Sequence, residues 1–134
     1  MGDLNKQDRG NVKKNQIVYL TTFPPRKCGI ATFTYDLTQA MDSLFEPVIK
    51  SKIVAMNASK VSGYRYNKKV IFQINQENAR EYITVAEKLN RIDTIKVVNI
   101  QHEFGIFGGE WGLYLIPFLK TLVKPKVITF HSVL

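Results

Sequence analysis

The sequence contains one cysteine, no long apolar run and few acidic residues. Cys28 alone cannot form a disulfide within the chain, so the cysteine content gives no reason to assign an oxidising compartment. No apolar run approaches the roughly 18 residues that a membrane-spanning helix needs. The polar N-terminus also lacks the apolar segment of a secretory signal. Together these features predict a soluble cytoplasmic protein.

Positive charge is in excess and is unevenly distributed. The formal net charge is +8, with six cations and no acid from Lys50 to Lys69, and three lysines and no acid after Glu110. Such a chain suits an anionic partner: a phosphate-bearing ligand, nucleic acid, or the anionic inner face of a membrane. Charge alone does not choose among these partners.

Apolar residues follow patterns typical of alternating strands and helices. The chain of 134 residues is 45% apolar, which is enough for one domain with a buried core. Helices are predicted at residues 30–45, 79–89 and 114–122, and strands at residues 16–23, 52–56, 70–74, 94–101 and 126–131. This alternation predicts an α/β fold, with a Rossmann-like parallel sheet and helices on both faces. A disordered polar tail is expected at residues 1–15, and the domain at residues 16–134.

Two local signals refine the helices. Asn75 is a candidate cap for the second helix, because its side chain can accept a hydrogen bond from a free N–H group of the first turn. Pro117 lies inside the third helical pattern, where it predicts a kink or a late start.

The first candidate site is the loop that precedes the first helix, within the stretch TTFPPRKCGIATF. Ligands of parallel α/β folds bind at the carboxyl ends of the strands, and a helix N-terminus there favours anions. Gly29 and Ile30 begin the predicted helix, and Arg26 and Lys27 add positive charge, so a diphosphate could bind here. The alternative is a plain tight turn with solvated cations, because a single glycine is neither a dinucleotide fingerprint nor a Walker loop. Cys28 is expected to be structural or incidental.

The second candidate site is the glycine-rich stretch HEFGIFGGEWG at residues 102–112, which follows the fourth strand. One imidazole, two carboxylates and three aromatic rings lie among four glycines, and polar groups beside aromatic rings suit sugars. The alternative is a glycine-rich connection with buried aromatics. His102 and Glu103 are adjacent and therefore point to opposite faces of a strand, so no metal site is expected. His131 ends the fifth strand at the same edge, where a structural and a functional role are equally compatible with the sequence.

The basic middle of the chain raises a different function. Cations interleaved with Tyr64 and Tyr66 are one signature of single-stranded nucleic-acid binding. No RNP, KH or zinc pattern accompanies them. A solvated basic loop is therefore the favoured interpretation, and nucleic acid is not the expected partner.

Three segments together resemble the N-terminal half of a family 4 glycosyltransferase of the GT-B fold: TFPPRKCGIATFTYDL, IQHEFGIFGGEWGLYL and VITFHSVL. The resemblance covers the chain from about residue 16 to its end. It implies a retaining enzyme that moves a sugar from a nucleotide-sugar to a carbohydrate or lipid-linked acceptor, without a bound metal or other cofactor. The first loop would lie beside the donor diphosphate, which assigns that role to Arg26, Lys27, Gly29 and Ile30.

The same resemblance assigns the remaining sites. The histidine that ends the fifth strand contacts the transferred sugar in the family, which makes His131 the catalytic candidate. The loop after the fourth strand forms the acceptor side, with candidate residues His102, Glu103, Gly108, Gly109 and Glu110.

This sequence departs from the family pattern in two ways. Many members carry two glycines in the first loop, and here the first position is Cys28. The family's C-terminal domain, which holds most of the donor site, has no counterpart in these residues, so the chain alone is expected to be catalytically incomplete. The alternative function is a stand-alone basic Rossmann-like module that binds nucleic acid or another anionic partner.

Overall fold

A computed structural model describes residues 14–133 of the chain. The tail predicted at residues 1–15 therefore lies almost wholly outside the described residues. Its last two residues are described, and the second of them, Asn15, already belongs to the first strand.

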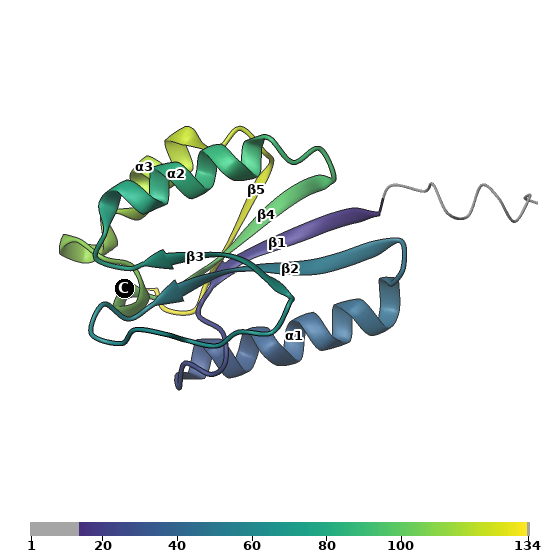
Figure 1. The fold of residues 1–134 in the computed structure, drawn as a ribbon, viewed down its shortest axis with the longest axis horizontal. Helices are drawn as coiled ribbons and strands as arrows, with labels where there is room; N and C mark the ends of the chain where they lie inside the picture. The colour runs from purple at the N-terminus through teal and green to yellow at the C-terminus, as the bar shows by residue number, and fades with distance from the viewer. Residues whose placement is uncertain (1–13, 134) are drawn as a thin grey trace, which may run out of the picture.

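Five parallel strands form one sheet, which confirms the Rossmann-like α/β class (Figure 1). The order across the sheet is β3-β2-β1-β4-β5, and every neighbouring pair is parallel. All five predicted strands are present: β1 (Asn15–Thr21), β2 (Ile49–Asn57), β3 (Val70–Asn75), β4 (Ile95–His102) and β5 (Lys126–Phe130). The start of β2 was predicted three residues too late, because its first residues alternate with lysines and look polar. Pairing of Ile49 with Asn15 of β1 extends the strand regardless of that pattern.

The helices cover both faces of the sheet. α1 (Gly29–Phe45) lies on one face, and α2 (Ala79–Asn90) lies with α3 (Leu115–Thr121) on the other (Figure 1). Two short 3-10 turns, η2 (Phe104–Ile106) and η3 (Glu110–Gly112), lie between β4 and α3. No helix joins β2 to β3; residues 58–69 form a loop there, and Tyr66 from that loop packs against the α1 side of the sheet.

Side-chain alternation along the strands creates two cores. Val18 and Leu20 of β1 point into the larger core, which α2 and α3 cover, while Tyr19 points into the smaller one on the α1 side. α1 approaches the sheet with the small residues Ala31, Thr34 and Thr38. The larger core therefore carries most of the apolar burial that stabilises the fold.

The structure corrects one cap and confirms the other helix signal. The N-cap position of α2 is Asn78, not Asn75, and the Asn78 side chain makes no capping bond to the first turn. The chain first makes a turn in which the Asn75 side chain accepts a hydrogen bond from the Glu77 N–H at 3.0 Å. Pro117 lies in the first turn of α3, where its missing N–H has no intrahelical partner to lose. The helix therefore starts late, as one of the two predicted outcomes.

Tyr82 of α2 fixes the glycine-rich loop to the rest of the fold. Its side chain is fully buried, and its hydroxyl donates to the Gln76 carbonyl at 2.8 Å while accepting from the Gly108 N–H at 3.0 Å. Burial raises the pKa of Tyr82 to about 12, so the hydroxyl stays protonated and able to donate.

We expect Tyr82→Phe to lower the free energy of unfolding by about 1–3 kcal/mol, because it leaves the partly buried Gln76 carbonyl and the buried Gly108 N–H without this partner. Urea denaturation of the purified chain measures this change. Tyr35→Phe is the matched control, since the Tyr35 hydroxyl bonds to Gln39 at an exposed position, and it should cost less than about 0.5 kcal/mol. Equal losses in the two variants would contradict the role of Tyr82.

Candidate functional site

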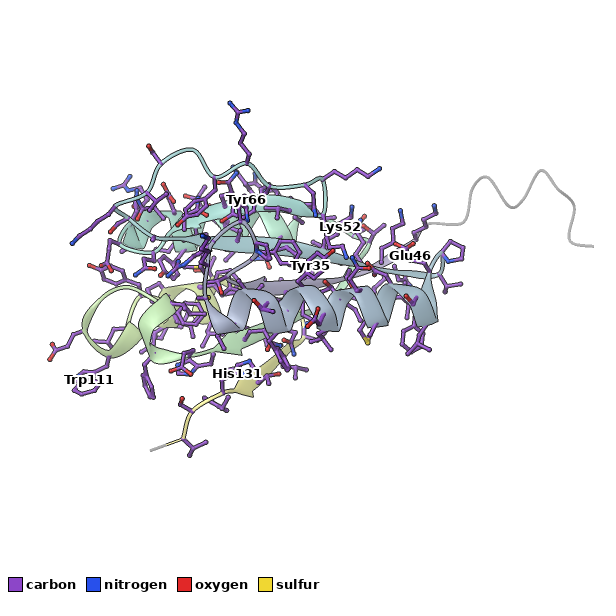
Figure 2. All side chains as sticks on the ribbon, turned by 90° about the horizontal axis from the view of Figure 1, so that it is seen from below. Tyr35, Glu46, Lys52, Tyr66, Trp111 and His131 are labelled. Carbon is purple, nitrogen blue, oxygen red and sulfur yellow. The ribbon has the colours of Figure 1, made fainter. Side chains whose placement is uncertain are left out.

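The residues predicted to carry function lie at the carboxyl ends of β1, β4 and β5. In the order β3-β2-β1-β4-β5, the chain runs outward to one side from β1 and then returns to pair β4 with the other side of β1. The carboxyl ends of the neighbouring strands β1 and β4 are therefore the topological switch point, where the loops that follow the strands diverge. Figure 2 shows His131 below α1, and Trp111 at the loop end of the molecule.

Cys28 holds the start of α1 in place. It is the N-cap residue, its sulfur accepts a hydrogen bond from the Ala31 N–H at 3.4 Å, and it contacts the Thr22 hydroxyl at 2.9 Å. The structural role expected for this cysteine is therefore supported by its contacts. The N–H groups of Gly29 and Ile30 have no acceptor among residues 14–133 and remain available to an anion.

Gly29 occupies an open position. A Cβ added there would meet no atom within 4 Å, and its backbone does not require the left-handed conformation that favours glycine. The fold itself thus gives no reason for glycine at this position. Of the two nearby cations, Arg26 donates to the Met56 carbonyl at the end of β2 at 2.9 Å, and Lys27 is exposed.

His131 lies one residue beyond β5 and contacts both β4 and α1. The backbone N–H of His131 donates to the backbone carbonyl of His102 at 2.9 Å. The His131 ring packs edge-on against the ring of Phe33, with 4.8 Å between the ring centroids. Phe33 is about one helical turn after Gly29. The structure therefore brings His131 beside the first turns of α1, as the shared sheet edge predicted.

Gln101 of β4 orients the His131 ring and was not identified from the sequence. The two side chains are joined at 2.6 Å between His131 Nε2 and Gln101 Oε1, and because an amide oxygen only accepts, Nε2 carries the proton. Gln101 is only 1% exposed and donates its own amide to Asn99, which donates in turn to the Thr129 hydroxyl at 3.3 Å. The one feature of the sequence that could have pointed to Gln101 is a polar glutamine at the end of a predicted strand rich in isoleucine and valine.

Glu103 joins the two loops of this edge. One carboxylate oxygen accepts from the Phe104 N–H at 3.1 Å, which caps η2, and the other accepts from the Ser132 hydroxyl at 2.8 Å. The carboxylate therefore fixes the segment after β4 to the segment after β5.

His102 lies in a cage of aromatic rings. Its ring centroid is 5.0 Å from that of Phe104, 5.8 Å from Phe107 and 5.2 Å from Phe130. Its Nδ1 is buried and has no hydrogen-bond partner among the described residues. Buried polar atoms are normally paired, so this nitrogen is an exception that the protein groups around it do not satisfy.

Packing accounts for the two neighbouring glycines of this loop. A Cβ on Gly108 would lie 1.8 Å from the Gln76 carbonyl oxygen, and one on Gly109 would lie 2.8 Å from the Tyr114 ring. Gly109 also has a φ of +77°. Both glycines are thus needed by the loop, whatever it binds.

The tip of the same loop is exposed and strained. Glu110 is exposed, and Trp111 is 75% exposed with a φ of 56°, a left-handed conformation that is rare for a bulky residue. In the sequence this ring is one of three aromatics in the loop, and no local pattern distinguishes it from the other two. Its exposure and conformation depend on the folded loop.

The tyrosines of the basic loop serve the fold. Tyr64 and Tyr66 stack on each other at 5.6 Å, and the Tyr66 hydroxyl donates to Asn57 at 2.6 Å. Burial raises the pKa of Tyr66 to about 12. Tyr66 therefore helps to cover the smaller core, from a loop that stands where a helix would usually join β2 to β3.

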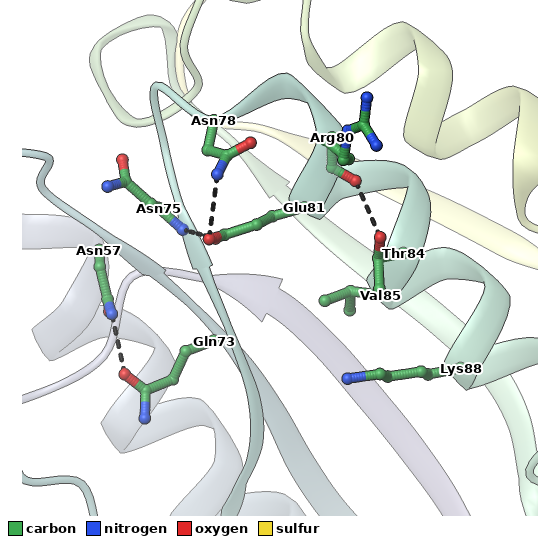
Figure 3. Close-up of a pocket in the computed structure, with 9 residues that line it drawn as sticks. All are labelled: Asn57, Gln73, Asn75, Asn78, Arg80, Glu81, Thr84, Val85 and Lys88. Atoms are coloured by element: carbon green, nitrogen blue, oxygen red, sulfur yellow. Dashed lines mark hydrogen bonds between the residues drawn. The ribbon is translucent and has the colours of Figure 1, made fainter.

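A separate polar hollow of about 440 Å³ lies between the ends of β2 and β3 and the start of α2 (Figure 3). Asn57 donates to Gln73 at 2.8 Å, and Glu81 accepts from the Asn75 N–H at 2.6 Å and from the Asn78 side chain at 3.2 Å. These polar groups satisfy one another, and we assign no ligand to this hollow.

Comparison with known proteins adds no assignment, because no family model, curated protein or solved structure matches the chain. Any functional conclusion therefore rests on the geometry of the site. Within residues 14–133 there is no group of three or more histidine, cysteine, aspartate or glutamate side chains that could hold a metal ion. In the same residues, no helix is both long and apolar enough to cross a membrane.

Gly29→Ala and Gly108→Ala form a matched pair, because a side chain would meet open space at Gly29 and the Gln76 backbone at Gly108. We expect Gly29→Ala to leave the free energy of unfolding unchanged or to raise it by up to about 1 kcal/mol, because alanine is the better helix residue and the site is open. Gly108→Ala should lower it by about 2 kcal/mol or more, because the methyl group displaces the Gln76 backbone. Urea denaturation compares the two, and a large loss for Gly29→Ala would show that the fold requires this glycine.

Proposed function

We propose that residues 16–134 form the acceptor-side domain of a retaining glycosyltransferase of the GT-B fold. The enzyme would transfer a sugar from a nucleotide-sugar donor to a carbohydrate or lipid-linked acceptor. One observation carries the proposal: the open first turn of α1 and the strand-end His131 lie together at the switch point of a parallel sheet, through the Phe33–His131 contact at 4.8 Å.

The donor side of this site would be built on the start of α1. The free N–H groups of Gly29 and Ile30 can bind a diphosphate oxygen, and the helix dipole favours negative charge at this end. Arg26 and Lys27 lie in the preceding loop and add positive charge. The missing side chain of Gly29 leaves room for the phosphate to approach the backbone.

His131 would contact the transferred sugar. Its Nε2 proton is committed to Gln101, so in the neutral ring Nδ1 is the nitrogen that can accept a bond from a sugar hydroxyl. The buried Gln101 holds this tautomer and ring orientation, and is therefore a positioning residue.

The acceptor side would be built on the loop after β4. His102 contributes a ring whose buried Nδ1 has no partner among the described residues, and Glu103 and Glu110 contribute carboxylate oxygens. The exposed ring of Trp111 is a flat surface for the C–H face of a sugar. Gly108 and Gly109 act here by shaping the loop.

The proposal assigns nucleotide binding to a second domain and uses no metal. In such an arrangement, the chain of 134 residues should bind the diphosphate end of a donor weakly and should not turn it over. Measurable transfer or hydrolysis by this chain alone would contradict the assignment of the donor site to a second domain.

Amide chemical shifts of the ¹⁵N-labelled chain test the site directly. Titration with UDP-glucose or GDP-mannose should shift the Gly29 and Ile30 amides, and a neutral oligosaccharide should shift amides of residues 102–112. Gly29→Ala should weaken donor binding by about tenfold, or about 1.4 kcal/mol. Lys120→Gln on the exposed surface of α3 is the control and should bind as the unchanged chain does.

The alternative function gives the opposite result. A stand-alone nucleic-acid module would bind random-sequence RNA tightly, with a steep dependence on salt concentration. That binding would be unaffected by His102→Ala or His131→Ala. Tight RNA binding together with unshifted Gly29 and Ile30 amides in the donor titration would replace the glycosyltransferase proposal.

A further inference from the structure

Lysines gather at the amino ends of the strands, at the edge opposite the candidate sugar site. Lys50 and Lys52 lie in the first residues of β2, and Lys68 and Lys69 immediately precede β3. Parallel strands place all of these positions at one edge of the sheet. Figure 2 shows Lys52 and Glu46 toward the C-terminal end of α1, far from Trp111.

These side chains line a hollow of about 280 Å³ between α1, β2 and the loop before β3. Lys50, Lys52, Lys68 and Lys69 contribute to its wall together with Asp42 and Glu46 from α1 and its C-terminal end. The space is several times the roughly 30 Å³ that one water molecule occupies in the liquid. It is therefore large enough for a ligand.

One of the two acids in the hollow is already neutralised. Asp42 forms an ion pair with Lys69 at 2.8 Å and accepts the Ser51 N–H at 2.8 Å. Burial alone would raise the pKa of Asp42, but the bonds from Lys69 and Ser51 hold it below its usual value. Asp42 and Lys69 thus balance each other.

The remaining three lysines face one acid. Lys50, Lys52 and Lys68 share the hollow with Glu46, which forms no ion pair within the described residues. Burial, followed by the charges of Lys50 and Lys68, lowers the pKa of Lys52. Positive charge is therefore concentrated in a partly buried space without enough negative charge to offset it.

We propose that this lysine pocket binds a phosphate-bearing anion with at least two negative charges. Ammonium groups are compact charges that suit phosphate oxygens approaching from several directions. A bound anion would offset the excess charge and relieve the repulsion among the lysines. Because the pocket lies at the opposite edge of the sheet, the proposal does not depend on the proposed glycosyltransferase function.

The phosphate could be free or could belong to an anionic lipid. Exposed apolar side chains lie near Glu46 in sequence: Leu44, in the last turn of α1, is 75% exposed, and Val48 is 63% exposed. Val48 ends a turn in which its N–H donates to the Phe45 carbonyl at 3.0 Å. A lipid surface would bury these side chains while its headgroups enter the lysine pocket. A free phosphate compound would leave them in water.

Calorimetric titration with sodium pyrophosphate, and flotation with phosphatidylcholine vesicles that contain or lack phosphatidylglycerol, test the pocket. We expect K50Q/K52Q/K68Q to weaken binding of whichever probe the unchanged chain binds, pyrophosphate or phosphatidylglycerol vesicles, by about tenfold or more, since three nearby charges are removed. K60Q/K120Q/K126Q removes the same charge at exposed positions outside the pocket, and should weaken binding by less than about threefold, through the long-range field alone. Circular dichroism checks that both variants are folded, and Lys68→Gln alone serves as a milder variant at an exposed position.

Each outcome has one meaning. Pyrophosphate binding that the pocket variant loses supports a free phosphate compound. Vesicle binding that needs phosphatidylglycerol, and that L44S/V48S also weakens, supports a lipid headgroup in the same pocket. Failure of both probes to bind the unchanged chain, or equal losses in the two triple variants, would overturn the proposal.

Discussion

The double pairing of β1 is the constraint on which the other features depend. β1 pairs with β2 from Asn15 to Thr21 and with β4 from Gln16 to Leu20, so both of its edges are satisfied within the sheet. Its position sets the switch point, because the chain continues from β1 to β2 and β3 on one side of β1 and then crosses to the other side as β4 and β5. The start of α1, the loop after β4 and His131 consequently meet at the carboxyl ends of the strands.

The parallel sheet also separates two kinds of chemistry. Its carboxyl edge carries an open helix N-terminus, glycines, aromatic rings and carboxylates, while the lysine pocket lies at its amino edge. In the sequence, the lysines and the candidate site alternate along the chain, and the net charge gives no sign of two separate sites. In the fold, every crossover returns the chain to the amino edge before the next strand, so Lys50, Lys52, Lys68 and Lys69 share an edge that the candidate site does not reach.

Similar residues have different roles once the surrounding backbone is known. Gly29 and Gly108 both lie in loops at the carboxyl edge, yet a side chain would meet open space at Gly29 and the Gln76 backbone at Gly108. Cys28 takes the capping position that serine or aspartate usually occupies, with sulfur as the acceptor. His102 and His131 both lie at strand ends, but aromatic rings surround His102, while Gln101 and Phe33 orient His131.

The sequence by itself determined the type and order of the elements and the parallel α/β class, because side-chain periodicity is a local property. Pro117 limited the third helix to a kink or a late start, and the fold shows the late start, at Leu115. The sequence also placed Gly29, His102 and His131 at one edge, since that follows from strand direction alone. Only the tertiary structure decided the early start of β2, the N-cap position of α2 at Asn78, the bond between Gln101 and His131, and the lysine pocket. These depend on strand order and register, which are fixed by contacts between residues far apart in the chain and leave no periodic signal in it.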